Sequence, residues 1–415
     1  MTARVVTTGK GCLETLVDLE ARIRQRAATL GFSACGFATA APLERGAFLE
    51  GWLAAGFAGE MRYLEWRPER RLTVAGVVPG ARTVISLVYP YDPPPAPAID
   101  WRADLRGRIA AYALREDYHR VIERELAALE AFIAAECPGS RTRRYVDTGP
   151  ILEREWAVRG GLGWFGKNTA LIDAPAGSWF LLAELVTTAP LVADLPAASR
   201  CGSCTRCLAA CPTGALRDGL VMDARLCISY LTIEHRTAIP RPLRSKLGPW
   251  IFGCDICQEV CPWNDKRMSD ERKPQPIPGP QTGRAFERSA RANAAADWAR
   301  LDRLFPSLPE LLALDDRGFR ARFARTPVTR AKRRGLLRNV AVALGNSGNP
   351  AALPALSCAI ADPEPLVRGH AAWALGKLRD RKARRLLERA HRVEHDPAVL
   401  AEIATALVEF GSPSN

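Results

Sequence analysis

The chain has 415 residues, of which 47% are hydrophobic, and a formal net charge of +13. Its length exceeds one ordinary hydrophobic core, so we expect a soluble globular protein of two to four domains. No stretch reaches the roughly 18 uncharged apolar residues of a membrane span, which excludes an integral membrane helix. The positive charge favours a polyanionic partner, with nucleic acid first and a membrane surface second. A generally arginine-rich surface is the alternative.

Residues 12–195 have the pattern of a mixed α/β domain. Helical periodicity covers residues 13–30 and 117–137, and a third helix is expected over 150–159. Short β-branched or apolar runs at residues 83–89, 144–146 and 180–186 predict strands.

Two features between residues 146 and 168 are candidate functional motifs. Asp147 precedes Pro150, so it suits a helix cap, and a general acid in a partly dry pocket is the alternative. Gly161-Leu-Gly163-Trp-Phe-Gly166 matches a dinucleotide fingerprint, but it follows a helix instead of a strand. We therefore expect a loop where backbone approaches a ligand, with Lys167 and Asn168 as donors, or else a plain tight turn.

The spacing of the cysteines is the strongest signal in the chain. The run Cys201-x2-Cys204-x2-Cys207-x3-Cys211-Pro212 is the bacterial ferredoxin signature, and Cys254-x2-Cys257-x3-Cys261-Pro262 repeats part of it. Ile251 stands where a complete second copy would have cysteine, and Cys227 is the candidate for the eighth thiolate. In the signature, three close thiolates bind one cluster and the fourth binds its neighbour. We therefore expect one [4Fe–4S] cluster on Cys201, Cys204, Cys207 and Cys261, and another on Cys211, Cys227, Cys254 and Cys257. A zinc ribbon and a disulfide framework are the alternatives.

A proline-rich stretch at residues 273–283 is typical of a linker, and a repeat follows it. Residues 338–345 recur at 368–376, and more weakly at 401–407. A period of about 31 residues predicts helix pairs stacked as in HEAT-like repeats, with turns at Asp362-Pro363 and Asp396-Pro397. Further helices are expected within residues 285–330.

Basic residues gather on this repeat region. Nine Arg or Lys lie between residues 315 and 345, and eight lie between 376 and 392. Stacked helices with basic edges form a nucleic-acid-binding face, whereas a merely solvated face is the alternative. The candidate contacts are Arg330, Lys332, Arg333 and Arg334.

Few histidines exist, and their pattern limits the metal chemistry. None of the five lies in a zinc-protease motif. Asp117-Tyr118-His119 begins the D-x-H-x-x-G loop by which some enzymes ligate the cobalt of cobalamin, but Ile122 replaces its glycine.

Three of these features together resemble one family, the epoxyqueuosine reductases. They are VDTGPILEREWAVRGGLGWFGKNT at 146–169, the incomplete double-ferredoxin pattern with CISYLTIEHR at 227–236, and the helical-repeat tail. The resemblance covers essentially the whole chain. It implies an oxidoreductase that removes the epoxide oxygen of epoxyqueuosine in the tRNA anticodon loop, giving queuosine in the last step of that nucleoside's synthesis.

The resemblance also implies cofactors and site residues. Family members bind cobalamin without a histidine ligand; the clusters pass electrons to cobalt, and reduced cobalt attacks an epoxide carbon. Asp147 matches the family's proton donor. The matching corrin-lining positions are Arg71, Ala110, Asp147, Leu171 and Ser229, with Lys167 and Asn168 in the same loop.

We therefore expect an α+β multidomain protein with four parts. A mixed α/β cobalamin-binding catalytic domain (1–195) precedes a ferredoxin-like module with two [4Fe–4S] clusters (196–272), a linker with helices (273–330) and a HEAT-like tRNA-binding domain (331–415). A cytoplasmic monomer served by a low-potential electron donor is expected, without a membrane partner. A corrinoid and iron–sulfur reductase of a small molecule is the alternative, and an electron carrier fused to an interaction scaffold is a third.

Overall fold

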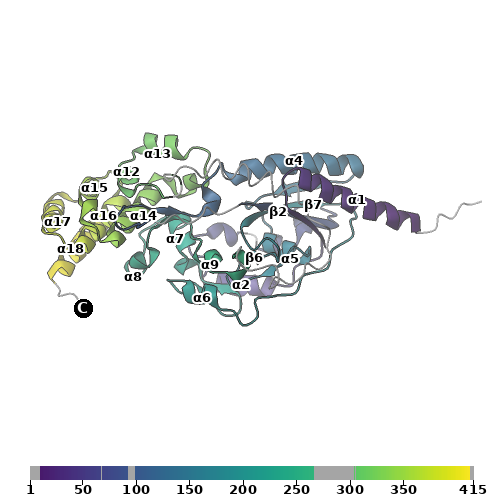
Figure 1. Ribbon diagram of the computed structural model, residues 1–415, viewed down its shortest axis with the longest axis horizontal. Coiled ribbons are helices and arrows are strands. Elements are labelled where there is room, and N and C mark those ends of the chain that lie inside the picture. Colours follow the sequence, from purple (N-terminus) through teal and green to yellow (C-terminus); the bar gives the residue numbers. More distant parts are fainter. Residues whose placement is uncertain (1–9, 67, 92–98, 266–302, 304, 412–415) are drawn as a thin grey trace, which may run out of the picture.

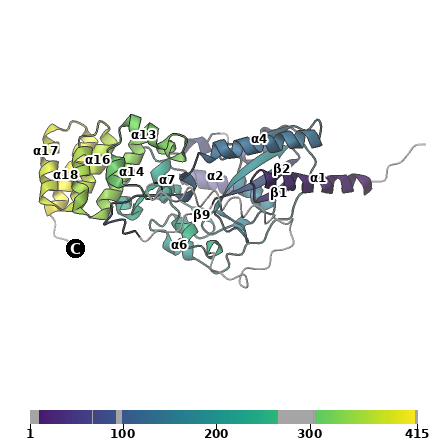
Figure 2. The ribbon, with the colours of Figure 1, turned by 45° about the horizontal axis from the view of Figure 1, so that its top comes forward.

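The computed structural model describes residues 10–66, 68–91, 99–265, 303 and 305–411. The molecule is elongated, with an α/β region at one end and stacked helices at the other (Figures 1 and 2). Within the described ranges, no helix is both long enough and apolar enough to cross a membrane.

A four-stranded antiparallel sheet forms the centre of the α/β region. Its strand order is β1 (Ala34–Thr39), β2 (Thr83–Pro90), β7 (Phe180–Thr187) and β4 (Thr142–Tyr145). The strands predicted at 83–89 and 180–186 are confirmed, and the one predicted at 144–146 lies two residues earlier at its start.

The alternating side chains of the sheet separate two cores. Ile85 and Leu87 of β2 pack on one face against α1 (Lys10–Thr29) and α4 (Tyr118–Glu136). Val84 lies on the other face, packed with Trp156 of α5 (Glu153–Arg159). This period-two burial is what a sheet covered on both faces requires. The two long predicted helices are confirmed, but the third begins at Glu153 and not at Pro150.

Shorter elements connect the sheet to the rest of the chain. The glycine motif enters a hairpin of β5 (Trp164–Phe165) and β6 (Leu171–Ile172), which confirms that it is not a dinucleotide fingerprint. The others are α2 (Gly46–Ala54), η1 (Arg62–Leu64), α3 (Glu69–Leu72), η2 (Val74–Gly76), β3 (Arg108–Ile109) and η3 (Ala111–Ala113).

The cysteine-rich segment has short elements joined by irregular loops. β10 pairs in parallel with β3 and so joins this segment to the N-terminal region. Its elements are α6 (Arg206–Ala210), β8 (Leu216–Arg217), β9 (Val221–Met222), η4 (Ala224–Leu226), α7 (Ile228–Ile233), α8 (Arg241–Arg244), η5 (Ser245–Leu247), β10 (Trp250–Phe252), α9 (Ile256–Glu259) and η6 (Pro262–Asn264).

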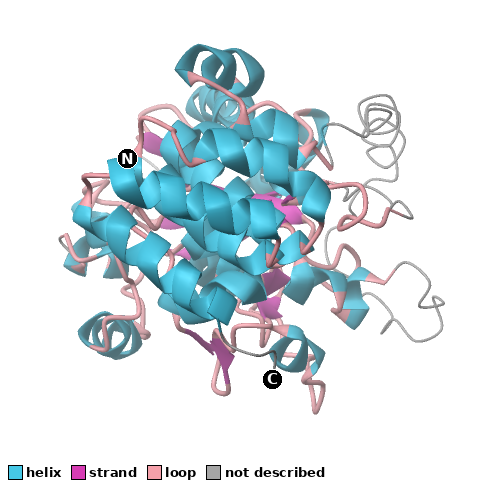
Figure 3. Cartoon of the chain, turned by 90° about the vertical axis from the view of Figure 1, so that its left-hand side faces the viewer, coloured by secondary structure: helices cyan, strands magenta, loops and turns pink. Residues whose placement is uncertain are grey.

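The predicted repeat is a stack of helices (Figure 3). Its three copies lie on α14, α16 and α18, which pack in succession. A Cβ on Gly345 would lie 2.8 Å from the Trp373 ring, so the glycine of the repeat allows close helix packing. The elements are α12 (Leu308–Leu312), α13 (Asp316–Phe323), η7 (Pro327–Ala331), α14 (Lys332–Ser347), η8 (Pro350–Ala352), α15 (Leu353–Ala359), α16 (Pro365–Leu378), α17 (Arg381–Val393) and α18 (Pro397–Gly411). The linker predicted at 273–283 lies outside the described residues, and α12 and α13 lie within the stretch expected to hold further helices.

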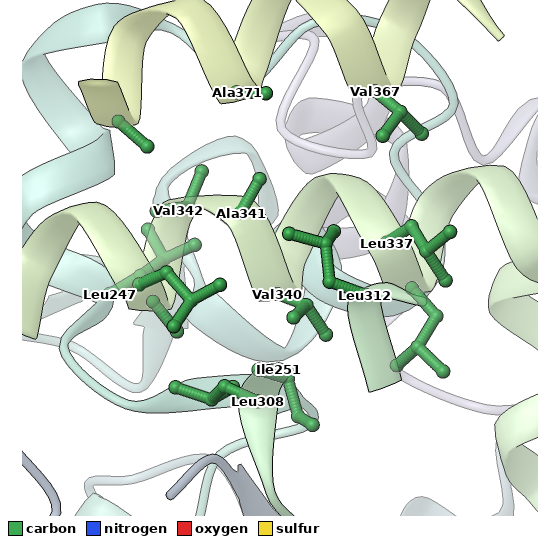
Figure 4. Close-up of a cluster of buried hydrophobic side chains, with 14 of the residues drawn as sticks. Leu247, Ile251, Leu308, Leu312, Leu337, Val340, Ala341, Val342, Val367 and Ala371 are labelled. Atoms are coloured by element: carbon green, nitrogen blue, oxygen red, sulfur yellow. The ribbon is translucent and has the colours of Figure 1, made fainter. Parts of the chain in front are cut away.

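One hydrophobic core joins the repeats to the cysteine-rich segment. Leu247 and Ile251 of that segment lie beside Leu308 and Val340 in this core (Figure 4). Because these side chains are fully buried together, the repeats are not an independently tethered tail.

Candidate functional site

The fold brings the two cysteine runs together. Helix α6, which carries Cys207, packs against α9, which carries Cys257. Cys227 immediately precedes α7, and Cys261 immediately precedes η6. Among the described residues, no three His, Cys, Asp or Glu side chains converge closely enough for a single metal ion.

Electrostatic effects among the thiols fall into two sets. Burial raises the pKa of Cys207, and the neighbouring Cys261 and Cys201 raise it further. Burial also raises the pKa of Cys261, to which Cys201 and Cys204 add. These four cysteines are therefore close neighbours.

The second set is equally connected. Burial raises the pKa of Cys254, and Cys227 and Cys257 raise it further. Burial likewise raises the pKa of Cys227, to which Cys211 adds. The pKa of Cys257 also responds to Cys207 of the first set, so the two sets adjoin. Eight gathered thiols are the donor set that two iron–sulfur clusters need.

Asp147 lies in the loop between β4 and α5, in the left-handed conformation with φ of +57°. Its Oδ2 accepts a 2.9 Å hydrogen bond from the Tyr118 hydroxyl and lies 3.4 Å from His119 Nε2. The hydrogen bond from His119 lowers the pKa of Asp147 below its ordinary value, and Tyr118 and Arg330 act in the same direction. The helix-cap interpretation is wrong, because α5 begins six residues later and its N-cap residue, Leu152, makes no side-chain cap.

His119 is a site residue that sequence reasoning missed. Its Nδ1 lies 2.7 Å from Oδ1 of Asp117, the residue that caps α4. Burial alone lowers the pKa of His119, but hydrogen bonds with Asp147 and Asp117 raise it above its ordinary value overall. The available signal was Asp117-Tyr118-His119 at a helix start, which places a carboxylate and an imidazole side by side. Its incomplete likeness to the cobalt-binding loop directed attention away from this arrangement.

Arg71 contacts the loop that carries Asp147. Its Nη1 donates to the Gly149 carbonyl at 3.3 Å and its Nη2 to the Tyr63 carbonyl at 3.1 Å. Its buried Nε has no hydrogen-bond partner among the described residues. Arg71 therefore has a donor left for an additional polar group beside Asp147.

The other expected corrin-lining residues lie near or within the cysteine-rich segment. Lys167 donates to the Gly202 carbonyl at 2.8 Å, and Asn168 to the Cys257 carbonyl at 3.5 Å. Ala110 is buried, and its amide donates to the Phe252 carbonyl. Two remain, Leu171, buried in β6, and Ser229, in α7.

The four basic candidates differ in their surroundings. Arg333 is held by Asp362 and is only 12% exposed, so its charge is engaged within the repeat. Arg330 donates twice to Glu234 at 2.9 Å, yet about half of its side chain is exposed. Lys332 is exposed, and Arg334 is exposed while it donates to the Arg236 carbonyl.

The fold and the site define a class: an oxidoreductase that combines an α/β domain, a double iron–sulfur module and a helical-repeat scaffold. The 4Fe-4S double cluster binding domain family matches residues 200–264, and HEAT repeats match residues 330–408. The family described as epoxyqueuosine reductase QueG matches residues 71–148.

Curated relatives narrow the class to one family. An epoxyqueuosine reductase of Xanthomonas campestris pv. campestris is 39% identical over 363 residues, which are 87% of this chain and 96% of the relative. One from Gloeobacter violaceus is 40% identical, over 79% of this chain and 97% of the relative. The chain belongs to the epoxyqueuosine reductase family.

Solved structures show the same fold. An epoxyqueuosine reductase crystallised with an epoxyqueuosine-modified stem loop of tyrosine tRNA has a TM-score of 0.83 and 30% identity, covering 96% of this chain and 100% of that one. The Bacillus subtilis enzyme, solved with its catalytic aspartate loop swung out of the active site, has a TM-score of 0.80 and 30% identity, covering 95% of this chain and 99% of that one.

Proposed function

We propose that this protein reduces epoxyqueuosine to queuosine in the anticodon loop of tRNA. Family membership, together with the relative's complex with a modified tRNA stem loop, supports this function. The observation within this chain that carries it is the joining of Asp147, His119 and Tyr118 beside basic Arg330.

The reaction requires protons as well as electrons. Removal of the epoxide oxygen breaks two C–O bonds, consumes two electrons and two protons, and leaves a carbon–carbon double bond and water. Asp147 is the proposed acid that protonates the departing oxygen. His119, whose pKa is raised, holds a proton 3.4 Å from Asp147 Oδ2 and can return one to the carboxylate.

The cysteines are proposed to bind two [4Fe–4S] clusters. Cys201, Cys204, Cys207 and Cys261 form one set, and Cys211, Cys227, Cys254 and Cys257 form the other. The mutual pKa effects of the thiols support this division. The contact of Asn168 with the Cys257 carbonyl connects the second set to the expected cofactor-binding loop.

Cobalamin is proposed to bind between the cysteine-rich segment and Asp147. When bound, it would carry electrons from the clusters to the epoxide carbon. Arg71, Ala110, Lys167, Asn168, Leu171 and Ser229 are the residues proposed to contact it. The free donor of Arg71 suits a polar cofactor edge, and His119 is already engaged through both ring nitrogens, which fits a site without a histidine ligand.

The tRNA is proposed to approach Asp147 along the repeat side. Arg330 lies close enough to lower the pKa of Asp147, and its guanidinium is 5.9 Å from the ring centre of half-exposed Tyr63. Phosphate contacts from Arg330, Lys332 and Arg334, with a base stacked on the ring, would suit an unpaired loop.

A low-potential electron donor is proposed to dock beside Cys261. A surface hollow of about 560 Å³ adjoins that cysteine, lined also by Arg206, Glu259, Pro262 and Asp265. Reduced clusters and a tRNA substrate further suggest a cytoplasmic monomer.

The test is direct conversion of the substrate. Anaerobically purified protein, loaded with iron and cobalamin and supplied with a low-potential reductant, should convert epoxyqueuosine-tRNA to queuosine-tRNA. Mass spectrometry of the digested nucleosides should show the loss of one oxygen atom. Fully loaded protein that leaves the nucleoside unchanged would overturn the proposal.

A further inference from the structure

A pair of glutamates lies behind Asp147 and has no part in the chemistry proposed above. Glu184, on β7, is completely buried, and neither of its carboxyl oxygens has a conventional hydrogen-bond partner among the described residues. Its carboxyl faces that of Glu153, the first residue of α5. Two carboxyls in contact without a cation between them form a stable pair only if they share a proton.

The neighbours of the pair do not supply a compensating charge to Glu184. Ser86 and Tyr145 are its partners across the strands, and both of their hydroxyls are buried without hydrogen bonds. Asp147 raises the pKa of Glu184 further. Arg154 is the cation that acts on Glu153, while Arg71 and Tyr118 also sense the Glu153 charge. Glu184 therefore remains protonated and donates to Glu153.

The pair is connected directly to the loop of Asp147. The backbone amide of Asp147 donates to Glu153 Oε1 at 2.5 Å. Asp147 has a positive φ, which costs an L-residue about 1 kcal/mol unless surrounding contacts hold it. This hydrogen bond is such a contact, because it fixes the amide next to the carboxylate that faces Tyr118 and His119.

We propose that Glu153, held by protonated Glu184, is a positioning residue that keeps the Asp147 loop in its working conformation and releases it when the pair loses its proton. The catalytic meaning of this latch rests on the proposed function, whereas the latch itself does not. Burial, followed by the charge of Asp147, raises the pKa of Glu153 to about 7. The folded protein thus binds the shared proton below this pH and loses it as the pH rises through it, which leaves two repelling carboxylates.

Hydrogen exchange at the Asp147 amide tests the latch without turnover. Full-length, iron-loaded protein is exchanged anaerobically between pH 6 and 8.5, and overlapping peptides across residues 146–152 are corrected for intrinsic exchange rates. Above pH 7, wild-type protection should fall about tenfold per pH unit. In Glu184→Gln it should stay level, because a side-chain amide donates to Glu153 at every pH. Glu155→Gln changes a carboxylate on the same helix outside the pair and should behave as wild type.

Two outcomes would overturn the latch: pH-independent protection in the wild type, or a Glu184→Gln profile equal to the wild type. If Glu184→Gln fails to fold, Glu153→Gln replaces it, since its side-chain oxygen still accepts from Asp147 and its protection should also be level.

Activity supplies a second readout. The wild-type kcat should decline on the alkaline side, and Glu184→Gln should extend the active range by about one pH unit at unchanged KM for tRNA. A protein that shows the exchange pattern but never reduces epoxyqueuosine would contradict the proposed function and leave the latch standing. An active protein with a flat exchange profile would do the reverse.

Discussion

The guanidinium of Arg338, in the first repeat helix, donates a 2.6 Å hydrogen bond to the carbonyl of Leu231, at the end of the cysteine-rich segment's helix α7. It also donates to the carbonyls of His235 and Thr237, so a fully buried cation is held by backbone oxygens alone in that segment. Burial lowers the pKa of Arg338 to about 9. Arg338 thus fastens the repeats to the segment that carries the clusters.

Replacing Arg338 with Met should therefore destabilise the whole chain. The lost bonds leave three buried carbonyls without donors, and relief of the buried charge offsets only part of this, so we expect about 3 kcal/mol. Denaturant unfolding measures the change, with Arg320→Met, on the exposed face of α13, as the control. Equal midpoints for both variants would show that the buried guanidinium contributes nothing.

Iron content tests the division of the cysteines. Cys227→Ser should lose about four irons of eight, because one cluster lacks a ligand while the other is complete. Iron quantification after anaerobic purification measures this. Cys358→Ser removes an exposed cysteine remote from the motif and should keep all the iron. Retention of the full complement in Cys227→Ser would refute the assignment of that residue.

The acid chemistry predicts two different losses. Asp147→Asn removes the proton donor and should lower kcat by at least about a hundredfold, with little change in tRNA affinity. His119→Gln should cost less, since Asp147 can still exchange protons with solvent. Because the raised pKa of His119 keeps its proton above the ordinary value, wild-type activity should decline only as the pH rises through that raised value.

Kinetics across pH separate these roles. An Asp147→Asn enzyme with undiminished kcat would exclude Asp147 as the donor. A His119→Gln enzyme whose pH profile matches the wild type would exclude His119 as its proton source.

The salt dependence of tRNA binding distinguishes the basic residues. Lys332→Gln with Arg334→Gln should weaken affinity and reduce the slope of log affinity against log salt by about 1.5, since each phosphate contact contributes about 0.7 to 0.9. Arg26→Gln, on an exposed position of α1, is the matched control. An unaltered slope in the double variant would mean that these charges are only solvated.

Arg333 is expected to act differently from its neighbours. Arg333→Gln breaks a nearly buried pair with Asp362, so it should lower stability more than it lowers tRNA affinity. A binding loss without a change in the unfolding midpoint would reverse this assignment.

The repeats should lose stability in acid through Glu394. The hydrogen bond from Arg368 lowers the pKa of Glu394 to about 2. A lowered carboxyl pKa stabilises the fold above its unfolded value near 4.5, and this stabilisation disappears as the pH falls toward 2. Acid unfolding monitored by circular dichroism should show a reduced slope over this range in Arg368→Gln. A slope identical to the wild type would contradict the linkage.

The sequence by itself determined the local features. Strand alternation at 83–89, helical periodicity at 117–137 and the 31-residue repeat depend on neighbouring residues, so they were readable in order along the chain. The ferredoxin spacing was readable for the same reason, because a cluster constrains its ligands within a few residues of one another. One local inference failed: Asp147 was expected to cap a helix, but that helix begins later and the carboxylate turns to α4 instead.

Only the tertiary structure decided which distant groups meet. His119 and Asp147 come together because α4 packs over the sheet that ends in the Asp147 loop, and Glu184 meets Glu153 because α5 covers its strand on the opposite face. Burial then fixes their protonation, and burial is a property of the packed whole. No spacing rule connects Arg338 to carbonyls more than a hundred residues away, since that bond exists only once two hydrophobic faces have merged into one core.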